Sequence, residues 1–158
     1  MDDISKLDYR PCVGIMVLNQ QRNIFTAQRL GFSSEAWQMP QGGIEKGEDT
    51  FAAAYRELEE EPSIDYSKVE LLEVSKNWLT YDLPSNLIPK LWNGSYRGQT
   101  QKWFLMNFVG VDNDINLQTS TPEFSSWRWS NRQQLLNGIV PFKKELYRAV
   151  IDEFHTFF

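Results

Sequence analysis

Residues 42–64 read GGIEKGEDTFAAAYRELEEEPSI, and the end of this stretch places four glutamates in five positions. They are Glu57, Glu59, Glu60 and Glu61. Like charges three or four residues apart destabilise a helix by roughly 0.2 to 0.5 kcal/mol per pair, and the C-terminal end of a helix also disfavours anions. The pattern therefore favours a bound cation that removes the repulsion, and a solvated acidic face is the alternative.

The same stretch predicts the limits of one helix. Asp49 or Thr50 supplies a side-chain oxygen that caps the N-terminus, and the helix should run to about Glu61. Pro62 marks the end, because a proline disfavours helical geometry in the residue before it. We therefore expect Pro62 to pull Glu61 out of helical geometry and to weaken its part in any metal site.

Three of the glutamates share one face of this helix. Glu57, Glu60 and Glu61 stand at positions i, i+3 and i+4, which project to the same side. Three convergent carboxylates suit a hard cation, so Mg²⁺ or Mn²⁺ is the expected cofactor. Leu58 lies on a neighbouring face that can pack against a sheet.

Length and composition predict one globular domain over residues 1–158. Hydrophobic residues make up 41% and charged residues 23%, which is typical of a globular protein and argues against a disordered one. The net charge of −5 argues against a protein that coats nucleic acid, because such binding needs a broad basic field. No DNA partner is expected.

The rare residue types narrow the chemistry and the compartment. Cys12 is the single cysteine, which excludes an internal disulfide, and His155 is the single histidine, which leaves little material for a zinc site. Acid–base chemistry is thus expected to use carboxylates. The segment 1–10 has no apolar signal region, and no apolar run approaches the roughly 20 residues of a membrane span. We expect a cytoplasmic protein without a membrane partner.

Several segments have the apolar or β-branched composition of strands: 12–19, 24–29, 37–43, 69–83, 101–111 and 125–130. The first two predict a hairpin, and the segment 84–100, with two prolines and two glycines, predicts a long loop. Helical spacing is expected in 132–138 and in 142–158, where Leu146, Val150 and Phe154 repeat on one side. Strands and helices interleave, which predicts one α/β unit with a mixed sheet.

The spacing across 42–64 resembles the Nudix box. The matched positions are Gly42, Glu48, Arg56, Glu57, Leu58, Glu60 and Glu61. So many fixed offsets favour a metal site over a solvated acidic face. The resemblance implies an α/β/α sandwich with a mixed β-sheet, in which the box forms a loop–helix–loop. The sequence departs from the family at Pro62-Ser63, where the glycine that usually follows the glutamates is missing.

The resemblance also implies a reaction, namely the metal-dependent hydrolysis of a phosphoanhydride in a nucleoside diphosphate linked to another group. The implied metal ligands in the box are Glu57, Glu60, Glu61 and the carbonyl of Gly42. Arg56 is implied to hold a carboxylate in place by charge-assisted hydrogen bonds, and it forms the catalytic set with Glu57 and Glu60. Glu48 is implied to be structural. The number of ions and the identity of the general base stay open.

Segments outside the box resemble the bacterial RNA pyrophosphohydrolases and the related asymmetric dinucleoside tetraphosphate hydrolases. They include YRPCVGIMVLN (9–19), GQTQKWFLMNF (98–108) and TPEFSSWRW (121–129). By this resemblance Glu123 is a further metal ligand. The expected substrate is 5′-triphosphorylated RNA, and a dinucleoside polyphosphate is the alternative. A binding module that kept the fold and lost activity is a third interpretation, motivated by Pro62-Ser63.

An acidic protein that binds an anionic substrate needs local cations. The matched positions supply candidates for substrate binding: Arg10, Arg29, Lys102 and Lys143 for the phosphates, with Gln41 and Tyr81 as hydrogen-bonding neighbours. Phe142 stands at the position from which the RNA-processing relatives stack a base, a contact worth about 1 to 3 kcal/mol. Trp92, in the long loop, is a weaker stacking candidate. The sequence does not identify protein partners or an oligomeric state.

Overall fold

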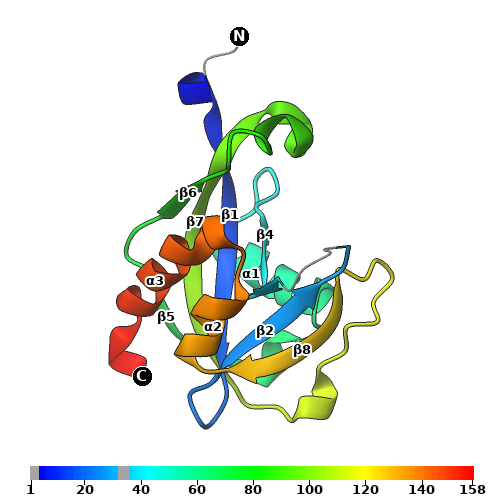
Figure 1. Ribbon diagram of the computed structural model, residues 1–158. Helices are drawn as coiled ribbons and strands as arrows, with labels where there is room; N and C mark the ends of the chain where they lie inside the picture. Colours follow the sequence, from blue (N-terminus) through cyan, green and yellow to red (C-terminus); the bar gives the residue numbers. More distant parts are fainter. Residues whose placement is uncertain (1–3, 32–35) are drawn as a thin grey trace.

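The computed structural model describes residues 4–31 and 36–158. Its sheet is built around β1 (Asp8–Leu18) and β7 (Tyr96–Phe108), which run parallel to each other at the centre of the molecule (Figure 1). The side chains of β1 are buried from Cys12 onward, because other layers cover both faces of this strand. The apolar run predicted as a strand is therefore the central one.

Antiparallel strands flank this central pair. β4 (Gln41–Gly43) pairs with β1, whereas β5 (Val69–Val74) and β6 (Leu79–Asp82) pair with successive parts of β7. The sequence predicts a strand within 69–83, and the structure divides this segment into two. The predicted loop 84–100 is also shorter than expected, because pairing with β6 draws its last residues into β7.

The remaining strands form an antiparallel extension of the sheet. β2 (Ile24–Arg29) follows β1 through a tight turn, which confirms the predicted hairpin, but it pairs with β1 at its first residue and then diverges. Its other neighbours are β3 (Trp37–Gln38) and β8 (Phe124–Ser130). Parallel and antiparallel pairs occur together, so the prediction of a mixed sheet is confirmed.

Helices cover both faces of the sheet. α1 (Thr50–Glu60) lies on one face, and α2 (Arg132–Gly138) and α3 (Lys144–Glu153) lie on the other (Figure 1). This layering confirms the expected α/β/α sandwich. Within residues 4–31 and 36–158, no helix has the length and apolar character needed to cross a membrane.

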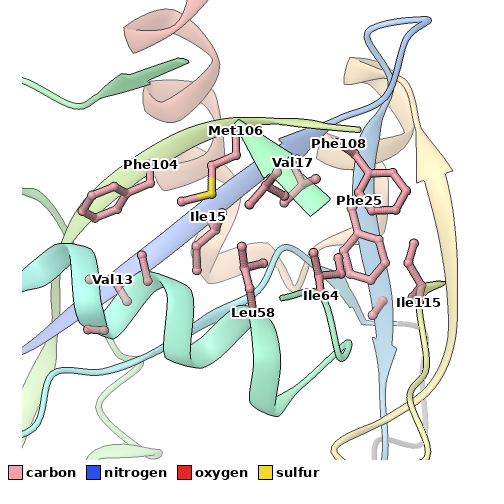
Figure 2. Packing of buried hydrophobic residues seen from close by; sticks show 14 of the residues in the cluster. Val13, Ile15, Val17, Phe25, Leu58, Ile64, Phe104, Met106, Phe108 and Ile115 are labelled. Carbon is pink, nitrogen blue, oxygen red and sulfur yellow. The ribbon is translucent and has the colours of Figure 1, made fainter. Parts of the chain in front are cut away.

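Each face has its own apolar cluster. Figure 2 shows Leu58 of α1 close to Ile15 of β1 and Met106 of β7, all of them buried. On the opposite face, Leu146 and Val150 of α3 pack in a second cluster with alternate residues of the same two strands. The helical spacing at the end of the sequence is thus a core-facing stripe.

The helix that carries the glutamates begins and ends where the sequence predicts, but the backbone geometry of Glu61 differs from the expectation. Asp49 caps its N-terminus, where its carboxylate accepts a hydrogen bond from the backbone N–H of Ala52 at 2.9 Å. The expectation that Pro62 removes Glu61 from helical geometry is wrong. Glu61 has φ −88° and ψ −70°, and its N–H donates to the carbonyl of Glu57 at 3.1 Å. Glu61 thus keeps both the helical dihedral angles that a following proline disfavours and the hydrogen bond along the helix.

Ser63 makes the turn that follows. Its φ of 63° lies in the left-handed region, which favours glycine, and it stands where the related box has glycine. Its hydroxyl donates to the carbonyl of Asn116 at 2.8 Å, and the N–H of Ile64 donates back to the carbonyl of Leu58 at 2.8 Å. The departure from the box therefore keeps the backbone turn and adds a side-chain hydrogen bond.

We predict that Ser63→Gly and Ser63→Ala separate these two effects. Alanine keeps the left-handed conformation and loses the hydroxyl, so Ser63→Ala should lower the free energy of unfolding by about 1 kcal/mol. Glycine loses the same bond but relieves a backbone cost of about 1 to 2 kcal/mol. The free energy of unfolding of Ser63→Gly should therefore equal or exceed that of the parent protein. Urea denaturation of the three proteins is the measurement. Equal stability of the glycine and alanine variants would contradict this account of the turn.

Candidate active site

A cleft of about 900 Å³ opens beside the C-terminal part of α1, β4 and the loop before β8. One set of its lining residues is acidic: Glu57, Glu59, Glu60, Glu61 and Glu123. Another set is basic: Arg10, Arg29 and Arg56. The structure thus brings together residues from opposite ends of the chain, and both signs of charge meet in one cavity.

Gly42 allows the closest approach between the helix and the sheet. A Cβ at this position would overlap the carboxylate of Glu57, so the backbone of β4 packs directly on that side chain. Glu57 is buried as a result. The glycine that opens the box is therefore required by packing, whatever its carbonyl binds.

Arg56 connects the loop before α1 to the helix. Its Nε and Nη2 donate to both carboxylate oxygens of Glu48 at 2.8 and 2.9 Å, and Nη2 also donates to the carbonyl of Gly43 at 2.8 Å. Its Nη1 donates to Glu57 at 2.8 Å and to Glu60 at 3.2 Å. One guanidinium thus offsets part of the repulsion within the acidic turn and fixes the position of two glutamates.

Burial and charge shift the pKa values of the acids unequally. The hydrogen bond from Arg56 lowers the pKa of Glu48, so this carboxylate stays ionised. Burial raises the pKa of Glu57, against the opposing effect of Arg56. Burial, followed by the charges of Glu57 and Glu123, raises the pKa of Glu61 well above its usual range. The two buried carboxylates, Glu57 and Glu61, therefore have raised pKa values, whereas the pKa of the partly exposed Glu48 is lowered.

The donor set fits a hard divalent cation, although the side chains are not arranged around a point. Among the described residues, no group of three or more His, Cys, Asp and Glu is placed to hold a metal ion. Glu57 and Glu60 instead face Arg56. The fit rests on Glu61, whose buried Oε2 has no hydrogen-bond partner in the described part of the chain and which lies near two further carboxylates. Ligation by these residues stays a prediction.

Arg10 contacts two groups at the edge of the cleft. Its guanidinium carbon lies 5.1 Å from the centroid of the Trp92 ring, and its guanidinium packs so closely on Gly43 that a Cβ there would overlap it. Trp92 and Asn93 have φ values of 49° and 57°, which are uncommon for such residues. The long loop, which contains the short 3₁₀ turns Ile88–Lys90 and Trp92–Gly94, thus brings an aromatic ring to the cleft.

Two predicted substrate residues lie just behind the cleft wall. Lys143 is buried, its ammonium is 5.5 Å from the centroid of the Tyr81 ring, and burial together with the charge of Arg29 lowers its pKa to about 8. Tyr81 is buried as well, and burial raises its pKa. Arg29 and Gln41, by contrast, line the cleft as expected.

Two other predicted residues lie outside the cleft. Phe142 lines a smaller pocket of about 340 Å³ between β6 and α3, with its ring centroid 6.0 Å from that of Tyr81. Lys102 does not reach the cleft, and its ammonium donates to the carbonyl of Lys76 at 3.4 Å. Neighbouring residues of a strand point to opposite faces, so Gln101 and Lys102 cannot both face the site. Lys102 is therefore not among the residues that line the cleft, and its role in phosphate binding stays a prediction.

Sequence reasoning missed several residues that line the cleft. They are Gln99 and the segment 119–121. A signal for Gln99 was present, because Gln99, Gln101 and Trp103 alternate along β7 with the period of two that marks one face of a strand. The segment 119–121 has no such pattern, and it is placed by its neighbour Glu123.

We predict that Glu61→Gln changes metal binding and stability in opposite directions. Without metal, the melting temperature should hold or rise, because the substitution removes a buried charge beside Glu57 and Glu123. The increase in melting temperature caused by Mn²⁺ should shrink, because a carboxylate ligand is lost. Thermal unfolding with and without Mn²⁺ measures both effects, and Glu70→Gln, an exposed change on β5, is the control. Equal stabilisation of parent and Glu61→Gln by Mn²⁺ would exclude Glu61 as a ligand.

Comparison with known proteins identifies the family. The model of the NUDIX domain matches residues 8–150. An RNA pyrophosphohydrolase of Roseobacter denitrificans is 54% identical over 155 residues, which are 98% of this chain and 97% of that protein. An RNA pyrophosphohydrolase of Sphingopyxis alaskensis is 52% identical and covers 98% of both chains.

Solved structures agree on the fold. A Caenorhabditis elegans Ap4A hydrolase binary complex has a TM-score of 0.65 at 19% identity and covers 93% of this chain and 99% of that one. The Escherichia coli dihydroneopterin triphosphate pyrophosphohydrolase has a TM-score of 0.67 at 19% identity, with 90% and 96% covered. Together with the match over residues 8–150, the α/β/α layering and the glutamate helix, these likenesses establish that the chain belongs to the Nudix hydrolase family.

Proposed function

We propose that this protein is an RNA pyrophosphohydrolase that removes pyrophosphate from the 5′-triphosphate end of RNA and leaves a 5′-monophosphate. The cleft carries this proposal, because it sets carboxylates that suit Mg²⁺ or Mn²⁺ opposite arginines that suit phosphates. The choice of RNA is supported by relatives named RNA pyrophosphohydrolase that are 54% and 52% identical over nearly the whole chain.

The acidic side of the cleft would hold the metal. The proposed ligands are Glu57, Glu60, Glu61, Glu123 and the carbonyl of Gly42. A divalent ion bound there would neutralise phosphate oxygens and lower the pKa of a water molecule. A glutamate of this set accepts a proton from the attacking water. The oxygen of that water bonds to phosphorus while the phosphoanhydride bond breaks and pyrophosphate leaves. Arg56 keeps Glu57 and Glu60 in place throughout.

The basic side of the cleft would bind the triphosphate. Arg10 is held in position for this role, because its guanidinium contacts Trp92 and the backbone at Gly43. Arg29 lies near Glu61, whose pKa its charge lowers against the effect of burial. Lys143, behind the wall, adds positive potential without direct exposure. Positioning and charge compensation of this kind supply most of the catalysis in phosphoryl transfer.

We predict that Glu60→Gln reduces turnover of triphosphorylated RNA by about 100-fold or more and leaves the protein folded. The side chain of Glu60 is 57% exposed and, within residues 4–31 and 36–158, forms an ion pair with Arg56 alone, so its loss should not lower the melting temperature. Activity should require Mg²⁺ or Mn²⁺. Full turnover by the folded variant, or undiminished turnover in chelator, would rule the proposal out.

The assay should include diadenosine tetraphosphate beside triphosphorylated RNA at equal concentration. The chemistry at phosphorus is the same for both substrates, so the ratio of their kcat/KM values reports what lies beyond the phosphates. We expect the RNA to be preferred. A clear preference for the dinucleotide would transfer the assignment to the dinucleoside polyphosphate hydrolases.

We predict that Phe142→Ala acts on RNA selectively. Its ring lies outside the acidic cleft, in the smaller pocket beside Tyr81, where a base of the substrate could stack. Losing a stacking contact of about 1 to 3 kcal/mol would lower kcat/KM on triphosphorylated RNA by roughly 5- to 150-fold. The kcat/KM for a short nucleoside triphosphate that does not reach this pocket should change little. If activity on both substrates falls together, along with the melting temperature, Phe142 packs the core and binds no base.

A further inference from the structure

A buried chain of side-chain hydrogen bonds connects the core to the cleft. It consists of Trp103, Gln101, Gln99, Gln41 and Tyr81, and we call it the glutamine chain. The indole N–H of Trp103 donates to Gln101 Oε1 at 3.1 Å. The amide nitrogen of Gln101 donates to Gln41 Oε1 and to Gln99 Oε1, each at 2.9 Å. The hydroxyl of Tyr81 donates to the same oxygen of Gln99 at 2.8 Å.

The chemistry of Trp103 fixes the direction of every bond in the glutamine chain. An indole N–H only donates, so the atom of Gln101 that it contacts must be the amide oxygen. The other end of Gln101 is then its NH₂ group, which can only donate, so the contacted atoms of Gln41 and Gln99 must be oxygens. The NH₂ groups of Gln41 and Gln99 therefore do not take part in the bonds to Gln101 and are directed away from it.

The two glutamines that carry these NH₂ groups border the cleft. Gln41 and Gln99 line it, whereas Gln101 is fully buried. Within residues 4–31 and 36–158, the amide nitrogens of Gln41 and Gln99 have no hydrogen-bond partner. They also lie near the cationic edge of the cleft, because Gln99 is the register partner of Arg10 across β1 and β7.

The sequence already predicts Gln41 as a hydrogen-bonding neighbour of the phosphates. We propose that Gln99 joins it as a second donor to the phosphate oxygens of the substrate, and that Gln101 and Trp103 are positioning residues that hold both amides in the donating orientation. A free glutamine amide can rotate by half a turn and present its oxygen instead, which would repel a phosphate. The glutamine chain prevents that rotation, because the amide nitrogen of Gln101 donates hydrogen bonds to the amide oxygens of Gln41 and Gln99.

Neutral donors have a specific use in this cleft. Five glutamates line it, and an additional lysine or arginine would form an ion pair with one of them. An amide NH₂ group binds an anionic oxygen without neutralising the carboxylates that suit a divalent ion. The orientation of the indole is itself fixed, because Trp103 is fully buried, packs edge to face on Tyr147 and fills the space left by Gly14.

The test is a nuclear magnetic resonance titration of the full chain, labelled with ¹⁵N, in Mg²⁺ with a nonhydrolysable imido-bridged nucleoside triphosphate. The side-chain NH₂ signals of Gln41 and Gln99 should shift on binding, and the Gln101 signal should move much less. In Trp103→Phe, which removes the fixed donor, the shifts of Gln41 and Gln99 should shrink and the affinity should fall about 10-fold. Leu105→Val, a conservative change in the same apolar cluster, is the control for altered packing and should keep both.

Gln99→Glu provides a second variant if Trp103→Phe does not fold. It keeps an oxygen for Tyr81 and Gln101 and replaces the cleft-facing NH₂ group by a second oxygen. We expect KM for triphosphorylated RNA to rise about 10- to 100-fold, more than kcat falls, because a charged acceptor replaces a donor to phosphate. An unchanged KM in Gln99→Glu, or Gln41 and Gln99 signals that ignore the ligand, would overturn the inference.

This inference rests on the proposed function for its natural substrate, but the two fail separately. If the protein binds the imido triphosphate through Gln41 and Gln99 and yet hydrolyses no RNA, the substrate assignment fails and the donor role stands. If RNA is hydrolysed while neither amide responds and Gln99→Glu keeps the parent KM, the donor role fails alone.

Discussion

The guanidinium of Arg56 is the interaction on which the cleft depends. The end of α1 concentrates like charges where the helix dipole also opposes them, and Arg56 is the cation within the described chain that hydrogen-bonds to two of these glutamates at once. Its bidentate pair with Glu48 and its bond to the carbonyl of Gly43 fix it from the other side. Because the loop and the helix share this one group, the acidic wall keeps its shape before any ligand arrives.

Opposing demands on charge explain why the cleft uses several kinds of polar group. Carboxylates suited to a metal must stay close together beside the core. Burial first, and then the charge of neighbouring carboxylates, raises the pKa values of Glu57 and Glu61 and costs stability. Phosphate binding needs positive or donating groups within the same cavity. The arginines of the cleft supply the positive charge. Neutral glutamine amides supply further hydrogen-bond donors and do not neutralise the carboxylates.

Much of this could be predicted from sequence wherever a local rule decides the outcome. The helix cap at Asp49 and the buried β1 follow from short-range patterns, and so does the presence of Glu57, Glu60 and Glu61 in the lining of one cleft, to which the resemblance added Glu123. The outcomes that the sequence did not predict have physical causes. A hydrogen bond along the helix kept Glu61 helical before a proline, strand alternation placed Lys102 outside the lining of the cleft, and the ring of Phe142 lines a second pocket, where its stacking role stays a prediction. Such outcomes depend on packing between distant segments, which no local pattern encodes.

The parallel pairing of β1 with β7 has a consequence for the order in which the protein is made. Arg10 lies opposite Gln99, so one wall of the cleft joins residues separated by most of the chain. Closing a loop of that length costs entropy before any contact is gained, and parallel pairs of high sequence separation form slowly. A nascent chain that ends before β7 already carries the whole of residues 42–64, yet it lacks the strand against which Arg10 is aligned. The motif is therefore synthesised early, while the binding surface exists only after the second half of the protein has folded onto the first.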